Sequence, residues 1–247
     1  MENQDSMTGH LEELRTRLLK SILAIGLIFL ACFFGFSEKI LDFARAPIVP
    51  YLPTGGLVFT APMDKFMAHV KVSLLASVIL GSPIWLYQLW KFIAPGLYQN
   101  ERKFSVLFIS FGTFLFLLGS SFVYFVVYPM AFKFLLQFGG MTDAPMITIS
   151  EYLSFFILTT MVFGIMFELP LVLTILGVMG LVTQDFLKAQ RRYALVILSV
   201  VSAMVTPPDI ISMLCMLLPL SLLYESSVIL VGVFGKKEEN TAVKSNT

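Results

Sequence analysis

The sequence predicts an all-α membrane protein in which six kinked transmembrane helices of unequal length form a curved wall with a concave face. Apolar residues make up 57% of the 247-residue chain and charged residues only 13%, whereas a soluble domain carries about 25% charged residues. The mean hydropathy is +0.85. The apolar residues also gather in runs close to the length of about 20 residues that crosses a bilayer. A formal net charge of +1 provides no basic surface for nucleic acid, so we expect no nucleic-acid partner.

Six spans are predicted within a single integral membrane domain that covers residues 1–247. The first apolar run follows a segment with four acidic residues and precedes no small-x-small cleavage site, so we interpret it as a retained span rather than a signal peptide. The fifth run is short, about 21 Å as a helix, and a re-entrant hairpin stays open for the last two runs. The predicted spans are residues 21–36, 70–93, 104–128, 152–178, 193–206 and 210–234, and residues 235–247 form a tail.

The lysine and arginine residues between the spans predict the orientation. Twelve of them fall on the side of the two termini and five on the other side. Cytoplasmic loops carry the excess of Lys and Arg, so both termini are expected in the cytoplasm.

Residues 1–20 are predicted to form a cytoplasmic amphipathic segment ahead of the first span. Leu11, Leu14 and Leu18 repeat at i, i+3 and i+7, so we expect a helix that lies along the inner membrane interface. Glu13 and Arg17 have the i,i+4 spacing of an ion pair of small energy.

Proline residues predict where helices end or bend, because each removes a backbone hydrogen bond. The loop over residues 37–69 holds four prolines, Pro47 among them, and is expected to form a folded cap on the outer face. Pro129 is expected to end the third span, and Pro207 with Pro208 to end the fifth. Kinks are expected at the prolines inside spans, namely Pro83, Pro170 and Pro219.

Glu168 is the strongest polar signal, because it lies in the middle of the fourth apolar run. An isolated carboxylate in lipid costs several kcal/mol, so Glu168 should face protein, water or a partner, or be protonated. We favour a functional role over a neutral carboxyl that makes an interhelical hydrogen bond. Glu225, nearer the inner end of the sixth span, is interpreted as structural, either snorkelling or paired with charges near Lys236. Asp209 is expected to cap the sixth span, with a contact on the outer rim as the alternative.

Two carboxylates are predicted on the cytoplasmic face. Asn100 can cap the third span, and Glu101 then lies favourably on the helix dipole. Glu13 and Glu101, with aromatic residues beside Glu101, would nonetheless form a site for a cationic peptide. Guanidinium groups suit such a site because they bind carboxylates in a two-pronged way.

With these motifs the chain resembles the TatC family, the multi-span core subunits of the twin-arginine protein translocase. The similarity runs in the family's order from about residue 10 to residue 234. The matching stretches are His10-Leu-Glu-Glu-Leu-Arg-Thr-Arg17, Phe92-Ile-Ala-Pro-Gly-Leu97, Glu101-Arg102, Phe167-Glu168-Leu-Pro170, Thr206-Pro-Pro-Asp209, Ala46-Pro47 and Tyr124-Phe-Val-Val-Tyr-Pro129.

The resemblance implies a receptor that binds twin-arginine signal peptides of folded cargo at the cytoplasmic face, within an oligomeric complex. Glu13 and Glu101 match the family's acidic residues that receive the arginines, with Arg15 and Phe92 close by. Glu168 matches the family's intramembrane acid on the concave face, thought to meet a polar residue of a partner. The implied partners are TatB-like and TatA-like single-span subunits in the bilayer. Transport is driven by the proton motive force, and no cofactor is expected.

Two other classes of function remain open at this point. A proton-coupled small-solute transporter could use Glu168 as its proton carrier, although no Lys, Arg or His lies deep in another span. An intramembrane protease needs a nucleophile with a base, two close acids or a metal. The histidines, His10 and His69, are at a membrane edge, and no HExxH motif is present, so we expect neither an enzyme nor a metal site.

Overall fold

The computed structural model describes residues 2–52, 56–93, 105–137, 146–205 and 210–235. Within these ranges the elements are helices, and a single isolated β-bridge joins Val58 to Thr148. The predicted all-α class is therefore confirmed. The elements are α1 Glu2–Arg45, the 3₁₀ turn η1 Val49–Tyr51, α2 Pro62–Leu80, α3 Ser82–Ile93, α4 Ser105–Phe122, the π-turn η4 Val123–Val127, α5 Tyr128–Gln137, α6 Ile149–Phe167, α7 Leu169–Val178, α8 Gln184–Ala189, α9 Arg191–Val205 and α10 Ile210–Phe234.

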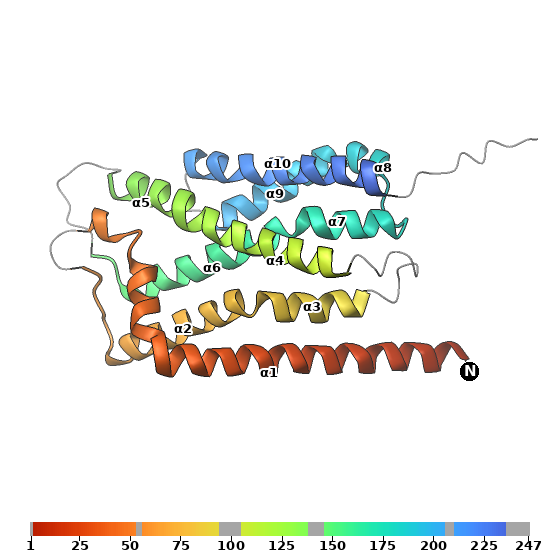
Figure 1. Ribbon diagram of the computed structural model, residues 1–247. Helices are drawn as coiled ribbons and strands as arrows, with labels where there is room; N and C mark the ends of the chain where they lie inside the picture. Colours follow the sequence, from red (N-terminus) through yellow and green to blue (C-terminus); the bar gives the residue numbers. More distant parts are fainter. Residues whose placement is uncertain (1, 53–55, 94–104, 138–145, 206–209, 236–247) are drawn as a thin grey trace, which may run out of the picture.

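The long helices lie side by side, with α1 along one edge of the molecule and α10 along the other (Figure 1). Helix α1 packs on α2 and α3, α4 packs on α3 and α6, and α7 packs on α10. We call the end where α1 begins and α3 and α7 finish the amino-terminal end of the bundle. The end where α5 finishes and α6 begins is the opposite end.

In the part of the chain that the structure describes, four stretches are helical, long and apolar enough to cross a membrane, and the bent pair α2–α3 would make a fifth. Helix α9 has 15 residues, about 22 Å, which is short of the hydrocarbon thickness of about 30 Å. The count of six spans therefore stays a prediction. The four stretches are Glu12–Arg45, Val106–Leu135, Ile149–Val178 and Met216–Phe234.

Helix α1 differs from the prediction for the amino-terminal segment. The separate interfacial helix over residues 1–20 is wrong, since these residues continue without a break into the first apolar stretch. The leucine repeat is compatible with both arrangements, because it specifies a helix with an apolar stripe and leaves the direction of its axis open. Residues 12–20, which carry the charged side chains of α1 near its start, therefore extend along the helix axis beyond its apolar part.

Breaks divide two of the spans, as the prolines predict. Helices α2 and α3 meet at Gly81 with a bend of 55°, and Pro83 lies in the first turn of α3. A Cβ at Gly81 would lie 2.7 Å from the carbonyl oxygen of Ser77, so this bend requires glycine. The fourth span breaks at Glu168, two residues before the buried Pro170. Pro219, by contrast, lies inside the unbroken α10.

Pro129 does not end the third helix, and that prediction is wrong. The π-turn η4 precedes Pro129, and the helix continues as α5 to Gln137. A π-turn inserts an extra residue into the helical ladder, which gives the helix a way to accommodate the N–H that proline lacks.

A cap closes the opposite end of the bundle, where the last turns of α1 bend across it (Figure 1). Ile48 is fully buried, and Pro47 is also buried. Tyr152 donates a hydrogen bond to the carbonyl oxygen of Ala44, although the two residues are 108 positions apart. Tyr124 donates to the carbonyl oxygen of Phe43 at 2.9 Å. The expected folded cap is thus present in the described part of the loop.

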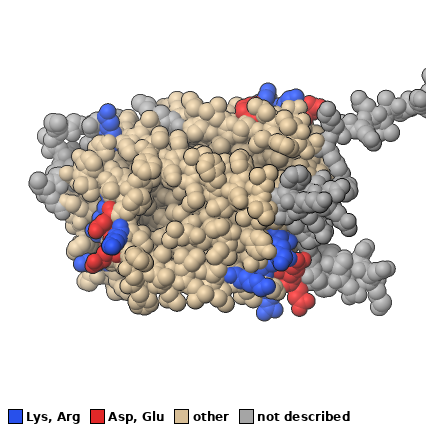
Figure 2. Space-filling model, viewed as in Figure 1, with Lys and Arg blue, Asp and Glu red and all other residues tan. Residues whose placement is uncertain are grey.

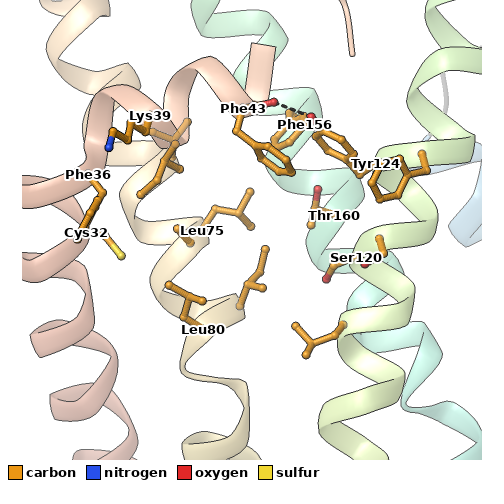
Figure 3. A pocket seen from close by; sticks show the side chains of 18 residues that line it. Cys32, Phe36, Lys39, Phe43, Leu75, Leu80, Ser120, Tyr124, Phe156 and Thr160 are labelled. Carbon is orange, nitrogen blue, oxygen red and sulfur yellow. Dashed lines mark hydrogen bonds between the residues drawn. The ribbon is translucent and has the colours of Figure 1, made fainter. Parts of the chain in front are cut away.

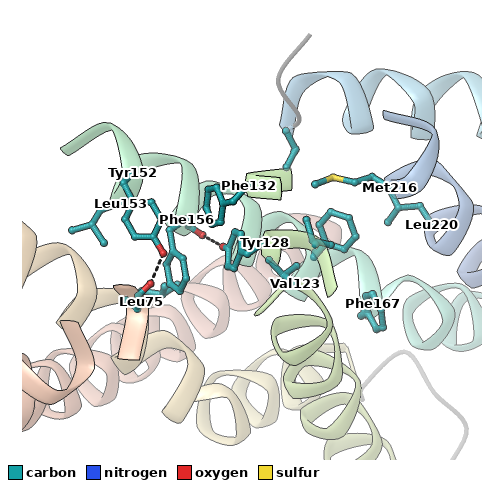
Figure 4. Close-up of a cluster of buried hydrophobic side chains, with 14 of the residues drawn as sticks. Leu75, Val123, Tyr128, Phe132, Tyr152, Leu153, Phe156, Phe167, Met216 and Leu220 are labelled. Atoms are coloured by element: carbon teal, nitrogen blue, oxygen red, sulfur yellow. Dashed lines mark hydrogen bonds between the residues drawn. The ribbon is translucent and has the colours of Figure 1, made fainter. Parts of the chain in front are cut away.

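Behind the cap lies the main cluster of buried aromatic side chains, which Figure 4 shows. Tyr128 is fully buried, and its ring stacks on Phe156 with centroids 4.6 Å apart. Its hydroxyl donates to the carbonyl oxygen of Phe156 at 2.5 Å and accepts from Thr160 at 2.7 Å. Because the buried hydroxyl of Tyr128 makes both hydrogen bonds, it holds α5 in one position along α6.

Candidate functional site

On the face that Figure 2 shows, the charged side chains of the described residues gather at the two ends of the molecule, and the surface between them is uncharged. That belt carries many exposed apolar side chains, such as Phe34, Val106 and Leu218, at 80%, 75% and 61% exposure. A belt of this composition is expected of a surface that faces lipid. The polar sites must therefore be sought at the ends or inside the bundle.

A small cavity at the amino-terminal end contains one of the two predicted carboxylates. Its volume is about 290 Å³. Glu13 lies on α1 and accepts hydrogen bonds at Oε1 from both the Nε and the terminal nitrogen of Arg17, the former at 3.1 Å. The cavity is lined by Glu12, Glu13, Thr16, Arg17 and Lys20 of α1 and by Lys91 of α3.

Helix α3 supplies the second wall of this cavity. The amino group of Lys91 lies 5.8 Å from the centroid of the Tyr87 ring. Trp90 is buried, and its ring stacks on Phe108 of α4 at 4.7 Å, which fixes the end of α3. Phe92 is half-buried one residue beyond Lys91. The structure thus brings Glu13 and the end of α3 to the same end of the bundle.

Other predicted residues of this face differ in their placement. Arg15 is exposed on α1. Glu101 lies outside the described residues, as do Asp209, Pro207 and Pro208. The proposed pairing of Glu13 with Glu101 in one site therefore stays a prediction.

Glu168 lies inside the bundle, at the break between α6 and α7. It is only 7% exposed. A Cβ on Gly112 of α4 would lie 3.1 Å from Glu168 Oε2 and 2.9 Å from a methyl group of Leu171. The α4 backbone thus comes close to the carboxyl because position 112 has no side chain. Among the described residues Glu168 Oε1 has no hydrogen-bond partner.

A larger cavity of about 490 Å³ opens on the half of the bundle nearer the cap (Figure 3). Helix α1 contributes Cys32, Phe36 and Phe43, and α2 contributes Leu75 and Leu80, all labelled around it in Figure 3. The walls also include residues of α4 and α6, and they are apolar apart from a few hydroxyl groups and Lys39. This hollow makes the face between α1 and α4 concave, and Glu168 is not among the residues that line it.

Glu225 on α10 pairs with a charged residue at the start of α9. Its carboxylate accepts a hydrogen bond from Arg191 at 2.7 Å, and the two side chains are 44% and 49% exposed. The neighbouring Tyr224 donates to the carbonyl oxygen of Leu187 at 2.8 Å. The predicted structural role of Glu225 agrees with this bond between α10 and the start of α9, whereas the charges near Lys236 lie outside the described residues.

Sequence reasoning missed two residues at these sites. Lys91 lines the small cavity, but a lysine at the end of a span also fits ordinary topology. Gly112 allows α4 to approach Glu168, and only its place among large apolar residues distinguishes it. Among the described residues, no group of three or more His, Cys, Asp or Glu side chains could hold a metal ion.

Comparison with known proteins decides the family. The model of the family described as Sec-independent protein translocase protein (TatC) matches residues 9–219. This chain belongs to the TatC family. The TatC protein of Desulforapulum autotrophicum is 41% identical over 240 residues, which cover 97% of this chain and 88% of the relative. The TatC protein of Escherichia coli is 37% identical over 235 residues, which cover 95% and 89%.

Solved structures of TatC share the fold. A crystal structure of the twin arginine translocase receptor TatC superposes with a TM-score of 0.80 at 37% identity, covering 90% of this chain and 97% of that chain. A second crystal structure, of the receptor in DDM, gives a TM-score of 0.81 at 36% identity, covering 92% and 100%. TatC proteins are non-enzymatic, multi-pass membrane components of a translocase, so the resemblance is confirmed and the solute-transporter alternative is not favoured.

Proposed function

We propose that this chain is the receptor subunit of a Sec-independent translocase and binds twin-arginine signal peptides of folded proteins. The observation that carries the proposal is the contact of Glu13 with a guanidinium group at the end of the bundle. A carboxylate that already binds Arg17 in this way offers the chemistry that a signal-peptide arginine requires. Glu101, Arg15 and Phe92 are proposed to complete the site.

The proposed site faces the cytoplasm. The excess of Lys and Arg on the side of the two termini supports this orientation in the inner membrane of a prokaryotic cell. Signal peptides of cargo that has not yet been exported are present on that side, so the orientation and the binding role agree with each other.

Single-span TatB-like and TatA-like subunits are the proposed partners, in an oligomeric complex that uses the proton motive force. Glu168 lies within a membrane-spanning stretch, and among the described residues its Oε1 has no hydrogen-bond partner, which supports a polar contact with a partner within the membrane. Ile165 and Val172 flank Glu168 by one turn on either side and are 54% and 45% exposed. Cysteines at these two positions should crosslink to a partner's span, while one at Leu27, which is 61% exposed, should not. Equal crosslinking at all three would contradict the proposal.

Peptide capture tests the receptor role directly. The full-length protein, purified in detergent, is incubated with a twin-arginine signal peptide and with a twin-lysine version of it. We expect selective capture of the arginine peptide. The isosteric Glu13→Gln substitution should weaken capture by about tenfold or more, because a charge-assisted hydrogen bond contributes about 1.5–3 kcal/mol.

Glu12→Gln serves as the matched control. Glu12 lines the same cavity and carries the same charge, while Arg17 binds its neighbour Glu13. If the two substitutions weaken capture equally, the effect is one of general charge, and Glu13 does not bind the arginine. Capture of both peptides alike by the unaltered protein would overturn the receptor role.

A further inference from the structure

The hollow between α1, α2, α4 and α6 opens sideways, onto the surface that is expected to face lipid. Phe36, Phe43, Leu80 and Phe125 line it, and each of these side chains is more than half exposed. All four belong to stretches that are long and apolar enough to cross a membrane. An occupant of the hollow therefore enters from the bilayer rather than from water.

The dimensions of the hollow suit one lipid tail. Its lining runs along α1 from Cys32 to Ala44 and along α2 from Val72 to Leu80, which are rises of about 18 Å and about 12 Å. One leaflet of the hydrocarbon core is about 15 Å thick. A helix about 10 Å wide would occupy about 1,200 Å³ over that length. The hollow, at about 490 Å³, has room for a tail but not for a partner's helix.

The walls of the hollow offer few free groups to a polar ligand. Three of its four hydroxyl groups, those of Ser120, Tyr124 and Thr160, already make hydrogen bonds within the protein. Most of the other lining side chains are apolar. A hydrocarbon tail needs no hydrogen bond and gains dispersion contacts with such walls. Because any lipid tail could make these contacts, a charged group must decide which lipid binds.

Lys39 is the one charged side chain that lines the hollow. Figure 3 shows it at the end nearer the cap, while Leu80 lies toward the other end. Among the described residues no carboxylate pairs with Lys39, whereas Asp42 pairs with Arg45 at 3.7 Å. A lysine near the membrane surface attracts anionic lipid headgroups.

From this juxtaposition we propose that the hollow binds one tail of an anionic phospholipid from the leaflet nearer the cap, and that Lys39 binds the lipid's phosphate. The length of the hollow matches one leaflet, and its only charge lies at the end where a headgroup would be. The proposal concerns a site at the other end of the bundle from Glu13, and it does not depend on the binding of signal peptides.

Native mass spectrometry of the full chain, purified in detergent, tests the headgroup contact. The protein is mixed with phosphatidylglycerol and phosphatidylcholine that have identical tails, and the ratio of the two one-lipid complexes is measured. Lys39→Gln should lower the phosphatidylglycerol-to-phosphatidylcholine ratio about fivefold, the contribution of one lysine near a membrane surface. Lys65→Gln is the matched control, since Lys65 is exposed near the start of α2 and does not line the hollow. It should leave the ratio unchanged.

A second pair of variants tests whether the tail lies in the hollow. Ala76 lines the α2 wall, so Ala76→Trp should fill the space and cause a loss of both lipid complexes. Ala31→Trp, at an exposed position of α1 outside the hollow, should leave both complexes intact. Ser120→Leu, on the α4 wall, is the alternative blocking variant if Ala76→Trp does not fold.

Three outcomes would overturn the proposal. The first is an equal fall of the lipid ratio in Lys39→Gln and Lys65→Gln, which would indicate an effect of general charge. The second is unchanged lipid binding by a folded blocking variant, which would place the tail elsewhere. The third concerns a photoreactive residue in place of Ile79, another lining residue, in native membranes. It should crosslink to phospholipid, and crosslinking to a protein span instead would mean that a partner occupies the hollow.

Discussion

Different interactions stabilise the two ends of the bundle. At the opposite end, buried or partly buried tyrosines donate to the backbone of the cap, as Tyr152 does to Ala44 and Tyr124 to Phe43. At the amino-terminal end, charged groups contact one another, as Arg17 does with Glu13. A buried carbonyl has no other donor available, whereas a partly exposed carboxylate can exchange one cation for another. The cap therefore fixes shape, and the amino-terminal cavity offers an exchangeable site.

The largest expected effect concerns the close contact between α4 and α6, which lies between the two ends of the bundle. A Cβ at Gly119 of α4 would lie 2.9 Å from the backbone oxygen of Phe163 on α6. Because a backbone atom cannot turn aside as a side chain can, Gly119→Val should destabilise the protein by about 3 kcal/mol and lower its yield. Thermal unfolding in detergent is the measurement.

Gly26→Val is the control for that substitution, since no heavy atom lies within 4 Å of an added Cβ there. It should change stability by no more than about 0.5 kcal/mol. Equal destabilisation by both would mean that the α4–α6 contact does not limit the size of residue 119.

An intermediate effect is expected at the cap. Tyr152→Phe removes the donor to the Ala44 carbonyl and leaves that oxygen unsatisfied, which should cost about 2 kcal/mol. Tyr87→Phe, on a side chain that is 43% exposed, should change stability little. The contrast between the ends predicts that Tyr152→Phe leaves the affinity of the folded protein for a twin-arginine peptide unchanged. A loss of affinity would show that the two ends are coupled.

The smallest effect is expected for the exposed pair of Arg191 and Glu225. A double-mutant cycle with Arg191→Gln and Glu225→Gln should give a coupling energy of about 0.5 kcal/mol, since both side chains are partly exposed. High salt should reduce this coupling further. A coupling above about 2 kcal/mol would contradict the view that ion pairs at this end are readily exchanged.

Much of the fold follows from the sequence alone, because local pattern decides it. The apolar runs predict the helices, and the prolines predict the breaks at Gly81 and Glu168. The scarcity of charge singles out Glu13 and Glu168 as residues that need an explanation. The failures lie where one pattern allows two structures: a leucine stripe suits an interfacial helix or an extended α1, and Pro129 can end a helix or follow a π-turn.

Tertiary structure alone decided which groups meet. Glu225 binds Arg191, which is 34 positions away, and Tyr152 binds the backbone of Ala44, which is 108 positions away. The closeness of Gly112 to Glu168 likewise depends on how α4 crosses α6. The physical reason is that hydrophobic periodicity reports the face of a helix, whereas a hydrogen bond depends on a distance of a few ångström between helices. The sequence determined which residues could carry function, and the packing determined their partners.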